Sequence, residues 1–372
     1  MKIVNRFLLC SSVFQLIIFK SILKKRFEEN VIFNDYVIIN NRNTIDSAKD
    51  LIINYSNILN IKKVFDLRDI VPNENVLFKN NKYKTIKSLI KNRVLIHYIK
   101  NIKNIIYSEV NTIDEVYYRL NYNLNDLIII NSLINYPKFF VIEDGMGDYF
   151  TFKHKSVNIY ELKNYLSDNL KKYFARIILT YLSQFKIIYP KPLSRFTNLP
   201  FKKNISVGKE FKIMIEEIIK KKNISKISEK EIILILGAPL LSDASRYNFD
   251  IDQEINMYNK LFNKIKYEHK IDDKNIYYKH HPRLSLQNWK IKKDKLLCNM
   301  LPYERLEMAE VELLINKVIH IYSVGSTTLI YSKKIFGVEG TVIDLTKYKL
   351  HKSHFLRTKT LYQDFDINVI EV

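Results

Sequence analysis

The sequence predicts an α/β protein made of two blocks of parallel βα units. Short apolar runs rich in Ile, Val, Phe and Tyr alternate with longer segments whose apolar residues recur at helical spacing. The alternation occurs before residue 150 and again after residue 228, and a basic stretch with several prolines separates the two blocks. Strands that alternate with helices form parallel sheets, so we expect one sheet in each block.

The first block opens with a strand at residues 3–10, a Ser-Ser turn and a helix at 13–25. The same patterns predict further strands at 30–39, 63–65, 104–107 and 138–142, and further helices at 47–59, 83–93 and 127–134. Residues 153–203 are predicted to form a helical excursion and a connector, and residues 209–227 a charged helix and linker.

The second block is predicted to contain strands at 231–236, 275–278, 318–323 and 342–345, with helices at 251–267, 306–316 and 327–335. The tail from residue 346 shows no pattern that predicts an element. We therefore expect an N-terminal domain at residues 1–205 and a C-terminal domain at residues 228–372, which includes this tail.

Composition restricts the function as well as the fold. The chain has 372 residues, 47% of them hydrophobic, which is enough for two cores. Its 60 Lys and Arg exceed its 39 Asp and Glu, a net charge of +21. This excess favours anionic partners, namely nucleic acid, an anionic membrane surface or an acidic substrate, although a Lys-, Ile- and Asn-rich composition raises it even without a partner. The two cysteines form no zinc-binding spacing and suit a reducing cytoplasm.

The N-terminus resembles a signal peptide only superficially. Its apolar stretch at residues 7–19 is interrupted by Ser11, Ser12 and Gln15, and no cleavage site of small residues follows. The stretch is also too short to span a bilayer, and no later segment has the required length and apolarity. We therefore expect neither export nor a transmembrane helix.

The centre of the predicted site is a strand that ends at His280-His281-Pro282-Arg283. Open α/β sheets bind their ligands at the carboxyl ends of their strands. An imidazole can exchange a proton near neutral pH, and a guanidinium can bind phosphate or carboxylate through two parallel hydrogen bonds. The alternative is an ordinary strand end with surface histidines, and the presence of two other motifs favours the ligand site.

The first of these motifs is Glu143-Asp144-Gly145, directly after the strand at 138–142. A carboxylate near a bound hydroxyl can act as a general base, and repulsion between adjacent carboxylates can raise the pKa of one of them. An acidic turn that caps a helix is the alternative.

The second motif, Gly325-Ser326-Thr327, joins the strand at 318–323 to a helix. A glycine turn, hydroxyls and the amides of a helix N-terminus can bind an anion, but no Gly-Lys-Ser/Thr ends the turn, so it is not a nucleoside-triphosphate loop. Glu304, before this strand, could bind ribose hydroxyls or cap a helix. No metal-binding motif stands in a suitable context, so phosphate charge is expected to meet Arg, His and helix dipoles.

Together these motifs resemble those of bacterial sialyltransferases of the lipooligosaccharide type, glycosyltransferase family 52. Related bacterial sialyl- and polysialyltransferases share an acidic motif, a His-Pro and a later Ser/Thr pair, which stand here as Glu143-Asp144-Gly145, His281-Pro282 and Ser326-Thr327. The opening residues 9–15 and the strand end at 236–239 also fit. The acidic motif begins with Glu instead of Asp, and an additional histidine precedes His281.

The resemblance implies a GT-B fold, in which two Rossmann-like domains face a central cleft, with the acceptor on the N-terminal side and the donor on the C-terminal side. It implies inverting transfer of sialic acid from CMP-sialic acid, with no cofactor or metal, to a terminal galactose of a lipooligosaccharide or capsule. By the same resemblance, Asp144, or else Glu143, is the base, and His281 stabilises or protonates the leaving phosphate. Ser326 and Thr327 would bind this phosphate, and Glu304 the ribose.

The resemblance extends to two sets of binding residues. On the donor side they are Gly237, Pro282, Arg283, Glu304, Gly325, Ser326 and Thr327. On the acceptor side they are Ser11, Ser12 and Gln15.

Two other functions stay open. The protein could be another glycosyltransferase on the same scaffold, such as a glucosyltransferase, or a non-catalytic basic protein that binds nucleic acid or a membrane. The favoured interpretation has a nucleotide-sugar donor, a glycan acceptor and no nucleic-acid partner. It places the enzyme in the cytoplasm, held peripherally at the inner face of the cytoplasmic membrane by its positive charge. The position of the glycosidic linkage is left open, as is whether the protein forms a homodimer.

Overall fold

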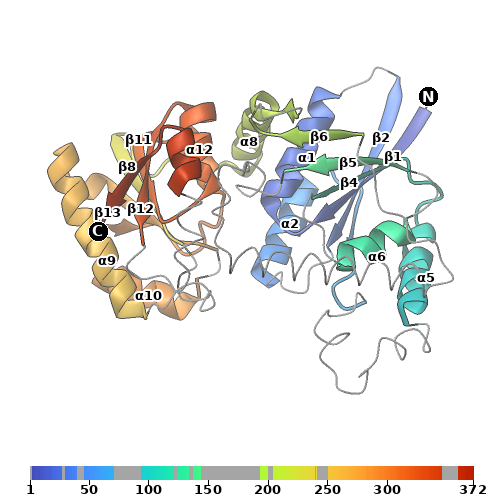
Figure 1. The fold of residues 1–372 in the computed structure, drawn as a ribbon, viewed down its shortest axis with the longest axis horizontal. Coiled ribbons are helices and arrows are strands. Elements are labelled where there is room, and N and C mark those ends of the chain that lie inside the picture. Colours follow the sequence, from blue (N-terminus) through green and yellow to red (C-terminus); the bar gives the residue numbers. More distant parts are fainter. Residues whose placement is uncertain are drawn as a thin grey trace. The chain divides into compact units, whose positions relative to one another are not determined.

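The computed structural model contains two α/β units (Figure 1). The described residues are 2–26, 30–39, 46–70, 94–119, 124–133, 137–143, 193–199, 204–238, 240, 250–282, 284–345 and 359–372. The chain divides between Phe211 and Lys212, inside helix α8 (Gly208–Lys222), into an N-terminal unit and a C-terminal unit. The predicted helix at 83–93 and most of the predicted excursion and connector at 153–203 lie outside the described residues. Within that connector, Ser194–Thr197 form a strand.

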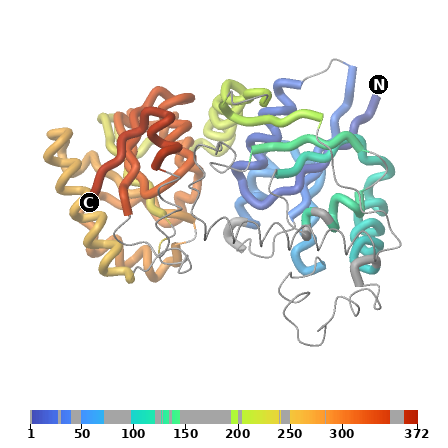
Figure 2. The backbone as a smooth tube through the Cα atoms, in the orientation of Figure 1, coloured from blue at the N-terminus to red at the C-terminus, as the bar shows by residue number. Residues whose placement is uncertain are grey.

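The N-terminal unit is built on seven parallel strands in the order β3-β2-β1-β4-β5-β6-β7. The strands are β1 (Lys2–Cys10), β2 (Val31–Ile39), β3 (Lys63–Asp66), β4 (Glu115–Arg119), β5 (Lys138–Ile142), β6 (Ser194–Thr197) and β7 (Ile205–Ser206). Besides α8, the helices are α1 (Val13–Lys25), α2 (Asp46–Ile58), α5 (Val94–Tyr107) and α6 (Leu124–Ser132). The sheet order runs from β1 outward to β3 on one side and continues from β1 to β4 on the other. Figure 2 traces the backbone in the colours of the sequence.

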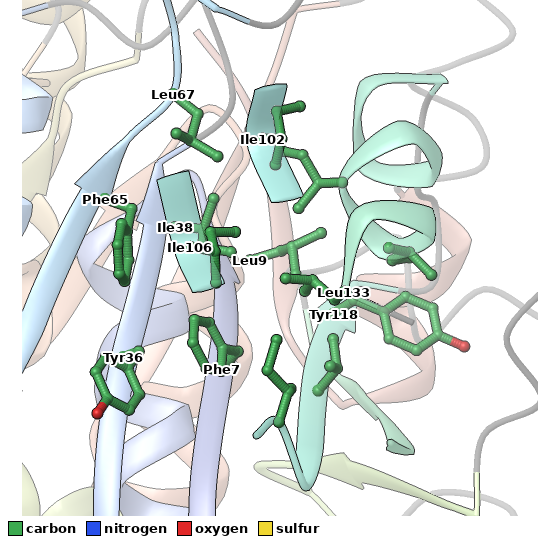
Figure 3. Close-up of a cluster of buried hydrophobic side chains, with 14 of the residues drawn as sticks. Phe7, Leu9, Tyr36, Ile38, Phe65, Leu67, Ile102, Ile106, Tyr118 and Leu133 are labelled. Atoms are coloured by element: carbon green, nitrogen blue, oxygen red, sulfur yellow. The ribbon is translucent and has the colours of Figure 1, made fainter. Parts of the chain in front are cut away.

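One face of this sheet carries an aromatic and aliphatic core (Figure 3). The ring of Phe7 on β1 stacks on Tyr36 of β2, with centroids 4.7 Å apart, and on Phe65 of β3, with centroids 6.1 Å apart. Ile102 and Ile106 of α5, one helical turn apart, belong to the same buried cluster. Burying one such side chain contributes roughly 1.5–3 kcal/mol, so these contacts fix α5 against the sheet.

The strand predicted at 104–107 was wrong, because these residues form the last turn of α5. Ile and Tyr favour strands when a short run is considered alone, whereas the buried Ile102 and Ile106 show the helical spacing of the longer segment. The strand at this point of the sheet is β4, which was not predicted. All four residues from 115 to 118 are buried, so no alternation of polar and apolar side chains marks it.

The C-terminal unit is built on six parallel strands in the order β10-β9-β8-β11-β12-β13. The strands are β8 (Glu231–Leu236), β9 (Ile276–Lys279), β10 (Asn299–Met300), β11 (Lys317–Ser323), β12 (Glu339–Asp344) and β13 (Asn368–Glu371). The helices are α9 (Ile251–His269), α10 (Leu286–Lys295), α11 (Ala309–Ile315) and α12 (Thr327–Tyr331), which continues as a π-helical turn (Ser332–Phe336). The predicted two-block α/β architecture is therefore confirmed.

Local signals explain the best-predicted helix of this unit. The Asp250 carboxylate accepts from the Gln253 amide at 2.7 Å, and the Gln253 side chain accepts from the Asp250 amide at 3.2 Å, so α9 begins with a complete capping box. The helix ends at Lys270, which adopts the left-handed conformation with φ 50°. Besides β4 and helix α5, which the sequence also failed to predict, the elements that were not predicted are short or highly charged, namely α10, β10, β13, β6 and β7.

Candidate functional site

The strand order reverses near the centre of each sheet, at β1 and β4 in the N-terminal unit and at β8 and β11 in the C-terminal unit. Open α/β sheets bind ligands outside the carboxyl ends of the strands at such a switch point. In the C-terminal unit, two segments leave this point: Gly237-Ala238 after β8, and Val324-Gly325-Ser326 after β11.

Gly237 approaches the neighbouring strand so closely that no side chain fits. Its amide donates to the carbonyl oxygen of Lys279 on β9 at 2.8 Å. A Cβ at this position would collide with the Tyr278 hydroxyl and lie 2.8 Å from the ring carbon that carries it. At Gly237 the turn after β8 therefore brings only backbone atoms to the switch point.

Ser326 begins α12 as its N-cap. The Ser326 hydroxyl accepts from the amide of Thr328 at 3.2 Å, and the Tyr362 hydroxyl donates to the Ser326 carbonyl oxygen at 3.1 Å. Gly325 is exposed, and a Cβ there would touch only the Tyr362 hydroxyl at 3.7 Å. Thr327 is half-buried on the first turn of α12. Each motif residue after β11 thus lies at the helix start that the sequence predicted.

The hydroxyl of Thr328, on the first turn of α12, makes a buried hydrogen bond inside the C-terminal unit. The Thr328 side chain donates to the buried Glu310 carboxylate of α11 at 2.8 Å. Burial raises the pKa of Glu310, although the bond from Thr328 opposes the shift. Glu310 was not among the predicted residues, and its contact anchors α12 on α11.

The two consecutive histidines after β9 have different surroundings. His280 is 3% exposed, its ring stacks on Tyr303 with centroids 5.4 Å apart, and neither ring nitrogen has a hydrogen-bond partner in the described part of the chain. Burial, and then the charge of Lys279, lower the pKa of His280 to about 4, against partial opposition from the Tyr303 backbone and, to a smaller extent, from Glu304. His281 is half-buried, so it is the more accessible imidazole.

The segments around these histidines are fixed by the following loop. The His281 carbonyl oxygen accepts from the Leu284 amide at 2.9 Å, and the Tyr303 hydroxyl donates to the Leu284 carbonyl oxygen at 3.2 Å. Pro282 and Glu304 are exposed beside them. Arg283, a predicted donor-binding residue, lies outside the described residues.

In the N-terminal unit the acidic motif begins at a fully buried residue. Glu143 follows β5 with 0% exposure, and its Oε2 accepts from the backbone amide of Asn198 after β6 at 2.6 Å. The first carboxylate of the motif thus connects two neighbouring strands. Asp144, the predicted base, lies outside the described residues. The buried Asn198 was not predicted.

The predicted acceptor-side residues form the first turn of α1. Gln15 Oε1 accepts from the Ser11 amide at 2.7 Å, and the Ser12 hydroxyl accepts from the Gln15 amide at 3.3 Å. Ser11, Ser12 and Gln15 are therefore brought together at the carboxyl end of β1, two strands from Glu143. The Ser11 hydroxyl and Gln15 Oε1 are also 3.2 Å apart.

Along the edge of the C-terminal sheet, Gly237 and the Gly325-Ser326 segment leave neighbouring strands. The His280-His281 pair leaves the next strand, and Glu304 follows the strand beyond it. The sequence therefore located the predicted residues of this unit that the structure describes on one sheet edge. It gave no sign of the side chains beneath that edge, because their contacts join segments far apart in the chain.

The neutral state of His280 predicts a stability that decreases in acid. The pKa of His280 is about 4 in the folded protein, below its ordinary value of 6.5, so the stabilising effect is complete above pH 6.5 and is lost as the pH falls towards 4. The loss is roughly 3 kcal/mol at most. Burial and the neighbouring His269 lower the pKa of His320 to about 4 as well.

The measurement is the thermal unfolding midpoint between pH 7.5 and pH 4.5 for the wild type and for His280→Phe, which retains a ring on Tyr303 but cannot titrate. We expect the variant to lose less stability than the wild type over this interval. Equal slopes for the two proteins would contradict the assigned pKa of His280.

Comparison with known proteins places this chain in a family. The model of the alpha-2,8-polysialyltransferase family matches residues 6–344. No curated protein sequence matches the chain. The match agrees with the resemblance to bacterial sialyl- and polysialyltransferases, while the narrower lipooligosaccharide type stays a proposal.

Solved structures show the fold. A sialyltransferase GT-B domain from Photobacterium damselae aligns over 100% of both chains with 10% identity and a TM-score of 0.50. An alpha/beta-galactoside alpha-2,3-sialyltransferase from Photobacterium phosphoreum covers 99% of this chain and 98% of its own, at 11% identity and a TM-score of 0.47. A UDP-GlcNAc 2-epimerase from Neisseria meningitidis covers 92% and 82%, at 13% identity and 0.47. With a GT-B fold and a family match over most of its length, the chain belongs to the alpha-2,8-polysialyltransferase family and is a glycosyltransferase of the sialyltransferase class.

Proposed function

We propose that this protein transfers sialic acid from CMP-sialic acid to a bacterial surface glycan, with inversion at the anomeric carbon and without a metal ion. One observation carries the donor side of the proposal. The glycine turn at Gly237, the helix start at Ser326 and the accessible His281 follow adjacent strands of one sheet, at the edge where such sheets bind ligands.

The proposed roles on the donor side follow from the charge that forms when CMP leaves. His281 stabilises or protonates the leaving phosphate, and Ser326 and Thr327 bind it, with Gly325 allowing close approach. Glu304 binds the ribose through its exposed carboxylate. Gly237, Pro282 and Arg283 complete the donor set.

On the acceptor side, we propose Asp144 as the base that removes the proton of the attacking hydroxyl. The burial of Glu143 and its bond to the Asn198 amide support this choice, because a fully enclosed carboxylate cannot reach a bound sugar. Ser11 and Ser12 contribute to the acceptor side, and the fully buried Gln15 supports them by accepting from the Ser11 amide.

Two acceptors are candidates for this reaction. A terminal galactose of a lipooligosaccharide or capsule is the acceptor that the site motifs suggest. The alpha-2,8-polysialyltransferase match favours a second candidate, a sialic acid already present on the glycan. For the donor, the alternative to CMP-sialic acid is a different nucleotide sugar.

The test is an incubation of purified protein with CMP-sialic acid and either a lactoside or an α2,8-linked oligomer of sialic acid, in the presence of a chelator. Transfer to either sugar supports the proposal and identifies the acceptor. Transfer only from another nucleotide sugar contradicts CMP-sialic acid as the donor. Transfer only after a divalent cation is added contradicts a reaction without a metal ion. Salt-sensitive binding to nucleic acid without donor hydrolysis would indicate the non-catalytic alternative.

We also propose a peripheral location at the inner face of the cytoplasmic membrane. No helix among the described residues is long and apolar enough to cross a membrane. The net charge of +21 supports contact with anionic headgroups. Sedimentation with anionic and zwitterionic vesicles at low salt tests it, and a protein that binds neither contradicts it.

A further inference from the structure

A buried ion pair lies behind the donor edge of the C-terminal sheet. The Lys292 ammonium of α10 and the Glu254 carboxylate of α9 are 2.6 Å apart, and each side chain is 1% exposed. Lys292 also donates to the Tyr278 hydroxyl at 3.2 Å and lies 5.9 Å from the centroid of the Tyr258 ring. No predicted motif includes these residues.

Stability alone does not explain this pair. Burial lowers the pKa of Lys292 and raises that of Glu254, although each partner opposes the shift of the other. Moving both charges out of water costs about as much as their attraction returns, and well-packed apolar residues are often equally or more stabilising. Glu254 Oε2 has no hydrogen-bond partner among the described residues, which adds to the cost.

Both tyrosines that contact Lys292 reach the turn after β8. The Tyr278 hydroxyl occupies the space that a Cβ of residue 237 would need. The Tyr258 hydroxyl accepts from the Ala238 amide at 3.4 Å, and the two rings meet edge to face with centroids 4.9 Å apart. The ion pair is therefore one contact away from the Gly237-Ala238 backbone.

Tyr278 also precedes His280 by only two residues. The carbonyl oxygen of Lys279, between them, accepts the Gly237 amide at 2.8 Å. A shift of the Tyr278 ring would therefore move both the turn at the switch point and the start of the histidine segment. Two parts of the proposed donor site depend on one buried side chain.

We propose that Lys292 and Glu254 are positioning residues for the donor nucleotide: Lys292, paired with Glu254, holds the Tyr278 hydroxyl, and Tyr278, packed against Tyr258, sets the position of the Gly237-Ala238 turn. This inference rests on the proposed function, because it takes that turn as part of the CMP site.

The first experiment replaces the whole pair by apolar residues, Lys292→Met with Glu254→Leu, and measures CMP affinity by calorimetry together with the thermal unfolding midpoint. We expect CMP to bind about tenfold or more weakly while the midpoint stays unchanged or rises. The control is Lys295→Met with Asp252→Leu, which removes a 2.8 Å ion pair between the same two helices with both partners exposed. This control should bind CMP as the wild type does.

The second experiment tests the route through the tyrosine. Gly237→Ala should weaken CMP binding about tenfold, because the new Cβ displaces Tyr278 or the turn. Adding Tyr278→Phe removes the atom nearest to the new Cβ, so the double variant should bind CMP more tightly than the product of the two single effects predicts.

The outcomes separate the inference from the function on which it rests. Normal CMP affinity in the folded apolar pair variant, or independent effects of Gly237→Ala and Tyr278→Phe, would overturn the positioning role alone. A wild-type protein that does not bind CMP would overturn both the positioning role and the proposed donor.

Discussion

Replacing His281 by alanine is expected to slow every reaction that expels CMP by about 10²–10⁴-fold, the usual contribution of a general acid or base. Departure of CMP leaves negative charge on a phosphate oxygen, and an imidazole that donates to this oxygen stabilises the transition state more than the ground state. Hydrolysis of the donor by water needs the same departure. Both transfer to sugar and donor hydrolysis should therefore decrease, and initial rates of CMP release with and without acceptor measure the two.

His280 supplies the matched control for this prediction. Its ring is enclosed against Tyr303, and its pKa of about 4 leaves it uncharged at neutral pH. His280→Phe should therefore retain turnover close to the wild type. A variant at His280 that loses turnover while His281→Ala keeps it would show that the wrong histidine has been assigned to the leaving group.

The fold was predictable where the local pattern and the tertiary contacts agree. The strands β5 and β8 are apolar runs buried on both faces beyond their first residue, as is typical of parallel sheets. The strands β1 and β11 end in buried runs of mostly apolar residues. Helix α9 has a capping box and a left-handed end in addition to its apolar spacing. Two such blocks, each with helices between the strands, leave few arrangements other than two parallel sheets.

The errors occurred where distant contacts override the local pattern. The strand β4 contains a buried Glu115, which is satisfied by Arg26 at the end of α1, at 2.9 Å. From sequence alone, a charged residue argues against a buried central strand, and the partner is 89 residues away. The strands β6 and β7, the last two of the sheet, have only four and two residues, too few for a pattern.

The residues of the candidate site also fall into two groups, those that a local motif predicts and those that depend on distant contacts. Motifs of consecutive residues located Ser326 and His281 on strand ends, since a strand end is a local feature. The pair Lys292–Glu254 joins two helices 38 residues apart and could not be predicted, because Lys and Glu on a charged helix are usually exposed. The burial of Glu143 depends on Asn198, 55 residues later.

Replacing the two carboxylates of the acidic motif is expected to have different effects, a loss of transfer at Asp144 and a loss of stability at Glu143. Asp144→Ala should reduce transfer to sugar by about 10²–10⁴-fold, because the acceptor hydroxyl has a high pKa and needs a base as it attacks. CMP affinity should remain, and donor hydrolysis should decrease less than transfer, because water can replace the sugar as the nucleophile.

Glu143→Ala should act mainly through stability. The change removes the carboxylate that accepts the Asn198 amide at 2.6 Å and leaves a buried donor without this partner, at a cost of about 1–3 kcal/mol. Glu143→Gln is the milder comparison, since its amide oxygen can still accept that bond. The decisive measurements are transfer rate, donor hydrolysis and unfolding midpoint for all three variants. Should Glu143→Gln abolish transfer without loss of stability while Asp144→Ala remains active, Glu143 is the base and the role of Asp144 is wrong.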